Sequence, residues 1–396
     1  MTRGEKKAPR LASQGRSKHK MFTSSDTSSD FYKNLSSTEI EKKLKAIENS
    51  EKFVDKYSEK KKMTNETAAT YLKTNLDDKE KIARNLKLCG TTLEFAREIG
   101  DGAMHLIGGY FCQKRLCPMC AFRRSLKTWY NIISIIREPE FQNLEWVFQT
   151  FTIKNCKPED LKLTIKRLLN AFARMTDNKN SAYNKQFVGW FRSLEVTYNA
   201  EDNTYHPHLH VLACVKKDYF KKTNEGYFSQ DKLQKHWKKF LNKATYTETV
   251  KKRLVTNGHE LIVVPEKAVR KFEPIDYFPV CHIEKVYGEE YQSIAEVSKY
   301  TVKAVDYSGN PEVLERLTVD LERVRCTAMG GVIKKVAQRL KLEDNELAGL
   351  DDTRSFREKV IDNPAFTLML LKWNSGAKIY EIVQVKKQQC GSKGVT

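Results

Sequence analysis

Three histidines alternate with other residues in the string His-Pro-His-Leu-His at residues 206–210, within a segment, 204–215, that is typical of a β-strand. Successive side chains of a strand point to opposite faces, so His206, His208 and His210 share one face. Imidazole nitrogens with this spacing can converge on one divalent cation. The pattern therefore requires a sheet in which this strand has a polar stripe on one face.

A second feature lies further along the chain, in Glu-Val-Ser-Lys-Tyr-Thr-Val-Lys at residues 296–303. We predict a helix here, on which Glu296 and Tyr300 stack four residues apart on one side. The competing interpretations are an accidental surface histidine pair and an ordinary surface Glu–Tyr pair. Together, a metal-binding strand and a tyrosine beside a carboxylate suit the cutting of a DNA strand by attack on phosphorus.

A third metal ligand is expected from the strand that precedes the histidines. Residues 186–198 are predicted to form a strand, and the polar turn 199–203 makes a hairpin with the histidine strand. Glu195 would supply the anionic oxygen that Mg²⁺ or Mn²⁺ favours. The sequence leaves the hairpin register open. We favour His208 and His210 as direct ligands, with His206 as a third ligand or an outer group.

The order of the predicted elements indicates an α+β fold with a central antiparallel sheet. A strand at 146–153, an amphipathic helix after Pro158, the hairpin, a helix after Ser229 and a strand at 280–287 follow one another. We expect the helices on one face of the sheet, with the other face open for the metal and a nucleic-acid strand. Residues 247–275 are ambiguous. The lysines of the helix after Ser229 suit either solvent or phosphate.

Four regions are predicted along the 396 residues. Residues 1–35 form a disordered basic tail, 36–130 a helical and cysteine-rich region, 131–310 the nicking domain, and 311–396 a C-terminal α/β extension. Lys and Arg exceed Asp and Glu to give a net charge of +20, which favours a phosphate-rich partner over an anionic membrane. The chain contains no apolar run of spanning length and no signal peptide at its start, so we expect a cytoplasmic protein.

Four of the nine cysteines are clustered in the sequence: Cys89, Cys112, Cys117 and Cys120. The last two form a Cys-x-x-Cys pair, which together with two cysteines upstream suits structural Zn²⁺ in tetrahedral coordination. Cys89 is the weakest member, and His105 is the alternative ligand. Reduced thiols without a metal are the competing interpretation. The other cysteines are expected to be buried thiols.

These motifs resemble those of rolling-circle plasmid replication initiators, the Rep_1-type branch of the HUH endonucleases. The string His-Pro-His-Leu-His-Val-Leu at 206–212 resembles the metal motif of that family, and residues 296–307 resemble its nucleophile motif. Phe-Thr-Ile-Lys-Asn at 151–155 resembles its first-strand motif, and residues 115–127 resemble its cysteine-rich segment. The resemblance runs from about residue 50 to 380.

The resemblance implies a palm-like HUH sheet and an activity. Such a protein binds the double-strand origin of its plasmid and nicks one strand in an extruded single-stranded hairpin loop. Tyr300 becomes joined to the 5′ phosphate and leaves a free 3′ hydroxyl for a host polymerase, assisted by a host helicase. Glu296 is taken to activate water or the second strand at termination, and Lys303 to balance phosphate charge. Tyr307 is a possible second nucleophile, although packing is the favoured role.

Two other functions fit the same residues. A relaxase or single-strand transposase shares the chemistry and differs in the DNA that it selects. A zinc-containing DNA-binding regulator without catalysis would use the histidines only to hold its structure. The sequence does not reveal the origin sequence, the oligomeric state or the way in which activity is shut off.

Overall fold

The computed structural model describes residues 51–99, 104–177, 181–221, 225–257, 260–286, 290–298, 301–342, 357, 360–361, 363 and 365–387. The predicted disordered tail, the start of the predicted N-terminal helical region and Cys390 lie outside these residues. So does Tyr300.

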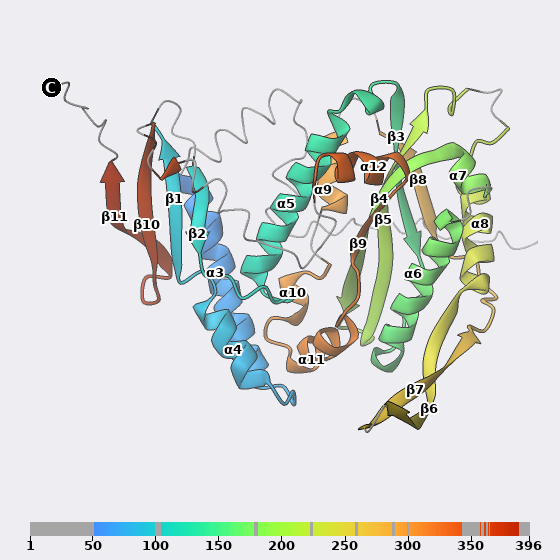
Figure 1. The fold of residues 1–396 in the computed structure, drawn as a ribbon, viewed down its shortest axis with the longest axis horizontal. Helices are drawn as coiled ribbons and strands as arrows, with labels where there is room; N and C mark the ends of the chain where they lie inside the picture. Colours follow the sequence, from blue (N-terminus) through green and yellow to red (C-terminus); the bar gives the residue numbers. More distant parts are fainter. Residues whose placement is uncertain are drawn as a thin grey trace, which may run out of the picture.

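A five-stranded sheet forms the centre of the fold (Figure 1). Its strands run in the order β8-β3-β5-β4-β9, and every neighbouring pair is antiparallel. The predicted α+β class with an antiparallel sheet is confirmed. The bounds are β3 Leu144–Thr152, β4 Phe187–Asn199, β5 Thr204–Lys216, β8 Cys281–Lys285 and β9 Thr327–Gly330.

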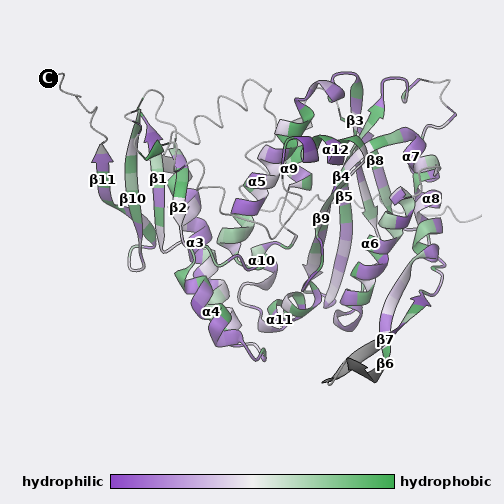
Figure 2. Cartoon of the chain, viewed as in Figure 1, coloured by the Kyte–Doolittle hydropathy of each residue, from purple (hydrophilic) through white to green (hydrophobic). Residues whose placement is uncertain are grey.

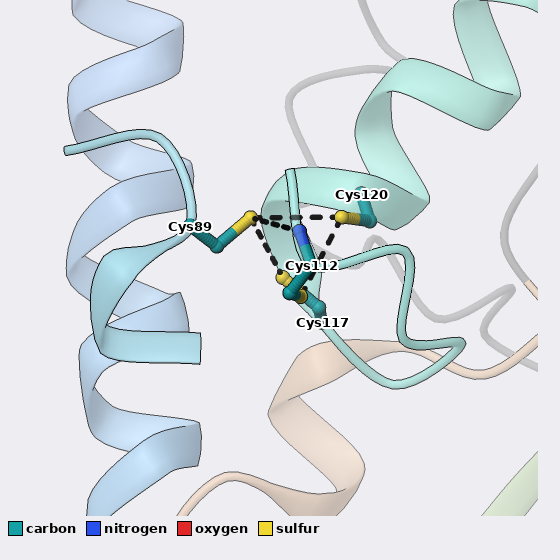
Figure 3. Close-up of side chains that lie close together, drawn as sticks. All are labelled: Cys89, Cys112, Cys117 and Cys120. Atoms are coloured by element: carbon teal, nitrogen blue, oxygen red, sulfur yellow. Dashed lines mark hydrogen bonds between the residues drawn. The ribbon is translucent and has the colours of Figure 1, made fainter. Parts of the chain in front are cut away.

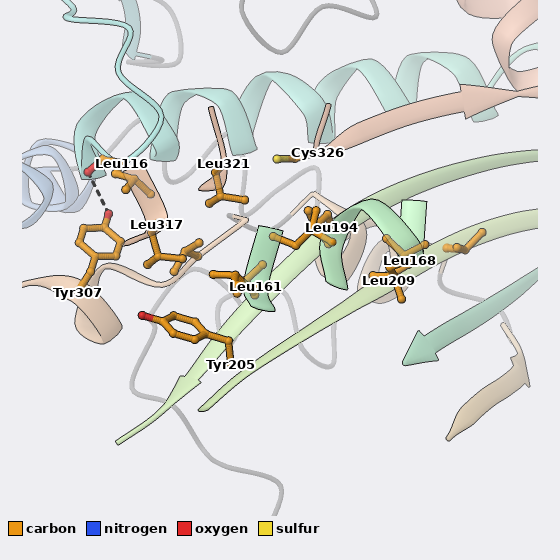
Figure 4. Close-up of a cluster of buried hydrophobic side chains, with 14 of the residues drawn as sticks. Leu116, Leu161, Leu168, Leu194, Tyr205, Leu209, Tyr307, Leu317, Leu321 and Cys326 are labelled. Carbon is orange, nitrogen blue, oxygen red and sulfur yellow. Dashed lines mark hydrogen bonds between the residues drawn. The ribbon is translucent and has the colours of Figure 1, made fainter. Parts of the chain in front are cut away.

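Two amphipathic helices, α6 (Leu161–Asp177) and α8 (Gln230–Lys243), cover one face of this sheet. Both were predicted, and Ser229 caps α8 by accepting a hydrogen bond from the Lys232 amide. Figure 4 shows part of the core beneath them, where Leu168 of α6 lies beside Leu209 of β5. The main hydrophobic core is therefore built on the face of β5 that carries Leu209.

Helices also cover part of the histidine-bearing face, so the prediction of helices on one face only is wrong. α5 (Pro118–Ile136), α9 (Glu290–Val297) and α12 (Gly331–Arg339) pack there in a second core with Leu212 and Cys214 of β5. The physical reason lies in residues 211–215, an unbroken apolar run that is typical of a strand buried on both faces. Among the described residues of β5, this second core contains Leu212 and Cys214, which follow His210 on the same face.

The N-terminal and C-terminal segments share a second antiparallel sheet, in the order β11-β10-β1-β2. It packs with the helices α3 and α4, which confirms the helical character predicted for this region. The domain boundaries remain a prediction. The central sheet crosses the boundary at residue 310, because its edge strand β9 lies after that residue. The bounds are α3 Glu51–Tyr71, α4 Lys79–Leu88, β1 Thr92–Glu98, β2 Met104–Gly109, β10 Phe366–Asn374 and β11 Ile379–Lys387.

The ambiguous segment after α8 forms a two-stranded antiparallel ribbon, β6 (Thr245–Asn257) and β7 (Glu260–Lys271), which projects from the body in Figure 1. Figure 2 shows hydrophobic and hydrophilic residues interleaved along helices such as α5 and α6, as expected for elements that are half buried. Among the described helices, none has the length and apolar composition that crossing a bilayer requires. The short elements are η1 Pro139–Phe141, η2 Pro158–Asp160, α7 Ala182–Gln186, α10 Ala304–Tyr307 and α11 Pro311–Asp320.

Candidate functional site

The β4–β5 hairpin has the register that the sequence left open. Glu195 lies directly opposite His208, and Ser193 lies opposite His210. Directly paired residues of antiparallel strands point to the same face, so the carboxylate of Glu195 and the two imidazoles are brought together. The turn between the strands contains Asn203 in the left-handed region at φ 50°, a conformation that asparagine tolerates better than most residues.

The three side chains converge at their tips. Glu195 Oε2 lies 3.0 Å from Nε2 of His210 and 3.4 Å from Nε2 of His208, and the two Nε2 atoms are 3.1 Å apart. All three side chains are largely buried; that of Glu195 is 9% exposed. Ligand atoms at about 2.1 Å from a cation in adjacent octahedral positions lie about 3.0 Å apart. The trio therefore fits one side of a divalent cation and leaves its other side open.

Hydrogen bonds on the far side of each ring fix how the histidines face the site. Nδ1 of His208 donates to the carbonyl of His206 at 3.2 Å, so Nε2 is the ring nitrogen that faces Glu195 and His210. Nδ1 of His206 lies 2.7 Å from Oδ1 of Asn155, and Nδ1 of His210 lies 3.4 Å from the Thr150 hydroxyl. Metal-binding histidines are commonly oriented by partners of this kind. His206 itself lies outside the converging trio.

The charge of the site also suits a cation. Burial alone would raise the pKa of Glu195, but hydrogen bonds to His208 and His210 lower it well below its usual value, so the carboxylate is ionised. Burial, followed by repulsion from His208, lowers the pKa of His206 to about 4. The site thus places one ionised carboxylate beside the ring nitrogens of His208 and His210.

The helix expected to carry the nucleophile is shorter than predicted. α9 ends at Val297, Ser298 lies in a turn, and residues 301–303 are not helical, so the prediction of one helix over 296–303 is wrong. The β-branched residues Val297, Thr301 and Val302 weaken helix propensity at this point. The i, i+4 argument that placed Glu296, Tyr300 and Lys303 on one helical face therefore fails.

Both flanks of the tyrosine are nevertheless fixed beside the site. The Thr301 carbonyl accepts a hydrogen bond of 2.8 Å from the amide of Val196, the residue after Glu195. On the other flank, the Ser298 carbonyl accepts a hydrogen bond of 2.7 Å from the Ser125 hydroxyl of α5. The described residues that flank the tyrosine in the sequence are thus held, Thr301 by β4 and Ser298 by α5.

Tyr307, the other candidate tyrosine, is a packing residue. It is buried on α10, and its hydroxyl donates to the Leu116 carbonyl at 3.1 Å, as Figure 4 shows. Lys303 precedes the same helix as its N-cap, with an extended backbone.

The four clustered cysteines come together in space as predicted (Figure 3). The Sγ atom of Cys89 lies 3.6 Å from those of Cys117 and Cys120, and the Sγ atoms of Cys112 and Cys120 are 3.7 Å apart. Four sulfurs bound at about 2.3 Å to a tetrahedral Zn²⁺ lie about 3.8 Å apart. The cysteines therefore fit a tetrahedral metal. His105, the alternative ligand, lies instead 4.0 Å from Glu98.

Local structure explains how residues from different elements meet there. Cys89 ends α4 and is followed by Gly90 at φ 65°, where an added Cβ would lie 3.0 Å from the side chain of Met119. Cys117 is the N-cap of α5, and Pro118 begins that helix. The helix N-terminus favours negative charge on the sulfurs at its first turn.

The thiols of the cluster differ in how their surroundings shift their pKa values. Burial raises the pKa of Cys117 well above its usual value, whereas hydrogen bonds from the other thiols, with Cys112 the strongest, lower the pKa of Cys120. The ammonium of buried Lys61 donates to the carbonyls of Lys87 at 2.6 Å and of Cys89 at 2.7 Å. A positive group beneath the cluster offsets part of the charge that bound thiolates would bring.

Sequence reasoning missed several supporting residues. Asn155 was visible only as the last residue of the first-strand motif, and Thr150 carried no signal, because cross-strand partners depend on the register. Lys61 was hidden in a lysine-rich helix, where nothing distinguishes a buried ammonium from exposed ones. The scattered cysteines Cys156, Cys214, Cys281 and Cys326 are buried, as predicted.

Comparison with known proteins gives a consistent result. The Rep_1 family profile, described as "Replication protein", matches residues 103–380. A "Protein rep" of Streptococcus pneumoniae serotype 2 is 30% identical over 308 residues, covering 76% of this chain and 84% of that protein. A "Protein rep" of Bacillus amyloliquefaciens is 33% identical with the same coverage. A "Replication protein" of Staphylococcus aureus is 32% identical over 247 residues, covering 60% of this chain and 91% of that protein. No solved structure matches the chain significantly.

Proposed function

The chain belongs to the Rep_1 family of replication proteins, as a plasmid replication initiator, and we propose that it starts replication by nicking one origin strand with Tyr300. The observation that carries the proposal is the convergence of Glu195, His208 and His210 on one point of the central sheet. The hydrogen bond between Val196 and Thr301 supports it, because it ties the tyrosine-bearing segment to the same strand.

Direct attack on a phosphodiester needs an aligned nucleophile, positive charge near the phosphate oxygens and a route for the proton. Mg²⁺ or Mn²⁺ held by Glu195, His208 and His210, with His206 as an outer group, would polarise the phosphate as a Lewis acid. A tyrosine phenol in water has a reference pKa of about 10 and is mostly protonated at neutral pH. For the proposed attack, placing the Tyr300 hydroxyl beside a phosphate made electrophilic by the metal matters more than a strong base that would remove its proton.

The proposed cleavage balances in atoms and charge. The bond from Tyr300 Oη to phosphorus forms while the bond from phosphorus to the 3′ oxygen breaks. The phenol loses its proton, and the leaving oxygen takes one up as a 3′ hydroxyl. One phosphodiester replaces another, so rejoining needs no ATP. The 3′ hydroxyl would prime a host polymerase, and a host helicase would unwind the strand.

Glu296 is proposed to act at termination. It lies at the end of α9, which packs against β4 and β5. A carboxylate there can take a proton from water or from the second attacking strand. Lys303 is proposed, from the family resemblance, to balance phosphate charge; it precedes α10 with an extended backbone.

The test is a labelled hairpin oligonucleotide taken from the plasmid origin, incubated with the protein and Mg²⁺ or Mn²⁺ and run on a denaturing gel. We expect a protein–DNA adduct that disappears with EDTA. Tight binding without an adduct on any origin DNA would favour the non-catalytic regulator. A relaxase would instead cleave at a transfer origin and leave the replication origin intact.

The cysteine cluster is proposed to hold structural Zn²⁺, and we expect Cys117→Ser to abolish zinc binding. Structural zinc contributes directly to folding, so the variant should also lose several kcal/mol of stability. Zinc content by mass spectrometry and a thermal unfolding curve measure both effects. Cys156→Ser, a buried thiol outside the cluster, is the matched control and should keep its zinc. Equal zinc content in Cys117→Ser and the wild type would contradict this site.

The cluster also fixes the start of α5, and Ser125 of that helix holds the Ser298 carbonyl beside the nucleophile segment. We expect Ser125→Ala to slow adduct formation about twofold to tenfold, because one hydrogen bond contributes about 0.5–1.5 kcal/mol. Affinity for Mn²⁺ should not change. Ser125→Thr keeps the hydroxyl and should restore the rate; a rate for Ser125→Ala equal to that of the wild type would show that this anchor is not needed.

A further inference from the structure

An exposed aromatic side chain lies in the segment between β7 and β8, at the end of the sheet that carries the histidines. The ring of Phe278 is 56% exposed, and Val280 beside it is 66% exposed. Burial of a phenylalanine side chain is worth about 1.5–3 kcal/mol to a fold. Because Phe278 is exposed, the fold lacks much of this stabilisation. Exposed apolar side chains of this kind mark a candidate binding surface.

The backbone under this ring is held in place. Two hydrogen bonds join residues 275–280 to α8: Gln234 Nε2 donates to the Pro279 carbonyl at 2.9 Å, and the Ile275 amide donates to Asn242 Oδ1 at 2.8 Å. Two more join them to β3 and the residues after it. The Thr152 hydroxyl donates to the Val280 carbonyl at 2.7 Å, and the Lys154 amide donates to Tyr277 Oη at 3.0 Å. Phe278 is thus presented on a fixed loop. A preorganised surface loses less conformational freedom when a ligand binds.

One positive charge lies over the exposed ring, on a lysine-rich helix. Nζ of Lys238 lies 4.3 Å from the ring centroid of Phe278, and it donates to the Asp276 carbonyl at 3.3 Å. Lys235 and Lys239 of the same helix are exposed. An exposed aromatic ring beside a lysine on a lysine-rich helix matches unpaired nucleic acid, since a base can stack on the ring while phosphates bind ammonium groups of the helix. An apolar protein partner would have to bury those charges.

The ring also lies close to the metal-binding trio. Thr152 of β3 pairs directly with His208, and its amide donates to the Val280 carbonyl at 3.2 Å on the other side. The path from His208 to Phe278 crosses two strand spacings of about 4.8 Å each, from His208 to Thr152 and from Thr152 to Val280. It then follows two residues of chain, at about 3.5 Å each, from Val280 to Phe278. The Cα atom of Phe278 is therefore at most about 17 Å from that of His208.

We propose that Phe278 and Lys238 form a stacking site for an unpaired base of the DNA strand that enters the histidine centre. The inference rests on the proposed function in taking single-stranded DNA as the substrate. The proposal also gives the lysine-rich face of α8 a function. Near Lys238, its ammonium groups would contact the phosphates of the bound DNA strand.

The probe is a fluorescein-labelled oligothymidylate of about 20 nucleotides, titrated by anisotropy. We expect Phe278→Ala to bind it at least about fivefold more weakly than the wild type, because one base–aromatic stack gives at least that factor. Phe278→Trp should retain affinity, whereas Phe278→Leu should be as weak as alanine. Tyr110→Ala, an exposed aromatic outside this surface, is the matched control. An abasic oligonucleotide should not distinguish the variants.

Unchanged affinity in Phe278→Ala would overturn the inference, and so would full affinity in Phe278→Leu, which would indicate apolar docking without stacking. The adduct gel separates this outcome from failure of the proposed function. An adduct with unchanged affinity in Phe278→Ala leaves the nicking proposal standing and removes the stacking site. A wild type that forms no adduct, but whose oligothymidylate binding depends on Phe278, supports the stacking site and removes the nicking proposal.

Discussion

His208→Ala is expected to slow origin nicking by about a thousandfold, because Lewis-acid stabilisation of the phosphate is worth several kcal/mol. The variant loses one of the three converging ligand atoms, whose Nε2 lies 3.1 Å from that of His210 and 3.4 Å from Glu195 Oε2. Two remaining ligands make a weak, open site. Single-turnover cleavage of the labelled hairpin at increasing Mn²⁺ measures the rate and the metal affinity together.

Two controls sharpen this result. Binding of duplex origin DNA should be largely intact in His208→Ala, because the His208 side chain is largely buried and its removal leaves the exposed lysines unchanged. His105→Ala, which removes a histidine outside the trio, should cleave as the wild type does. If His208→Ala loses duplex binding and cleavage together, the histidines hold the fold, and the catalytic assignment is wrong.

Tyr300→Phe is expected to abolish the protein–DNA adduct altogether, since phenylalanine has no oxygen to join to phosphorus. DNA affinity and the thermal unfolding midpoint should change little, because only a hydroxyl is removed. The adduct gel and an anisotropy titration of the same preparation measure both properties.

Tyr307→Phe is the matched control for this variant. Tyr307 is buried, and its hydroxyl donates to the Leu116 carbonyl, so its removal costs one hydrogen bond and no nucleophile. Tyr307→Phe should therefore still form the adduct. An adduct that persists in Tyr300→Phe and vanishes in Tyr307→Phe would move the nucleophile to α10.

Much of the site followed from local patterns in the sequence. The alternation of histidines predicted the strand and its polar stripe, and the spacing of the cysteines predicted their cluster. Glu195 was proposed from its place in the preceding strand, and the structure confirms that it meets His208 and His210. Local periodicity carries these features, because side-chain direction in a strand depends only on the backbone.

Other features depend on contacts between distant segments, which a single sequence does not reveal. The cover of α5, α9 and α12 over Leu212 and Cys214 was missed, although the apolar run after His210 indicated burial on both faces. The helix that ends at Val297 was extended too far, because its tertiary anchors, the bonds from Ser125 to Ser298 and from Val196 to Thr301, join residues far apart in the chain.

The mass of the DNA-linked peptide after proteolysis tests the central claim most directly, namely that the histidine and glutamate trio presents a phosphate to Tyr300. The wild-type adduct, digested with trypsin and nuclease, should yield a peptide containing Tyr300 that carries the added mass of a 5′-phosphorylated nucleotide, and only when Mg²⁺ or Mn²⁺ was present. The same mass on any other peptide, or an adduct that forms equally in EDTA, would contradict it.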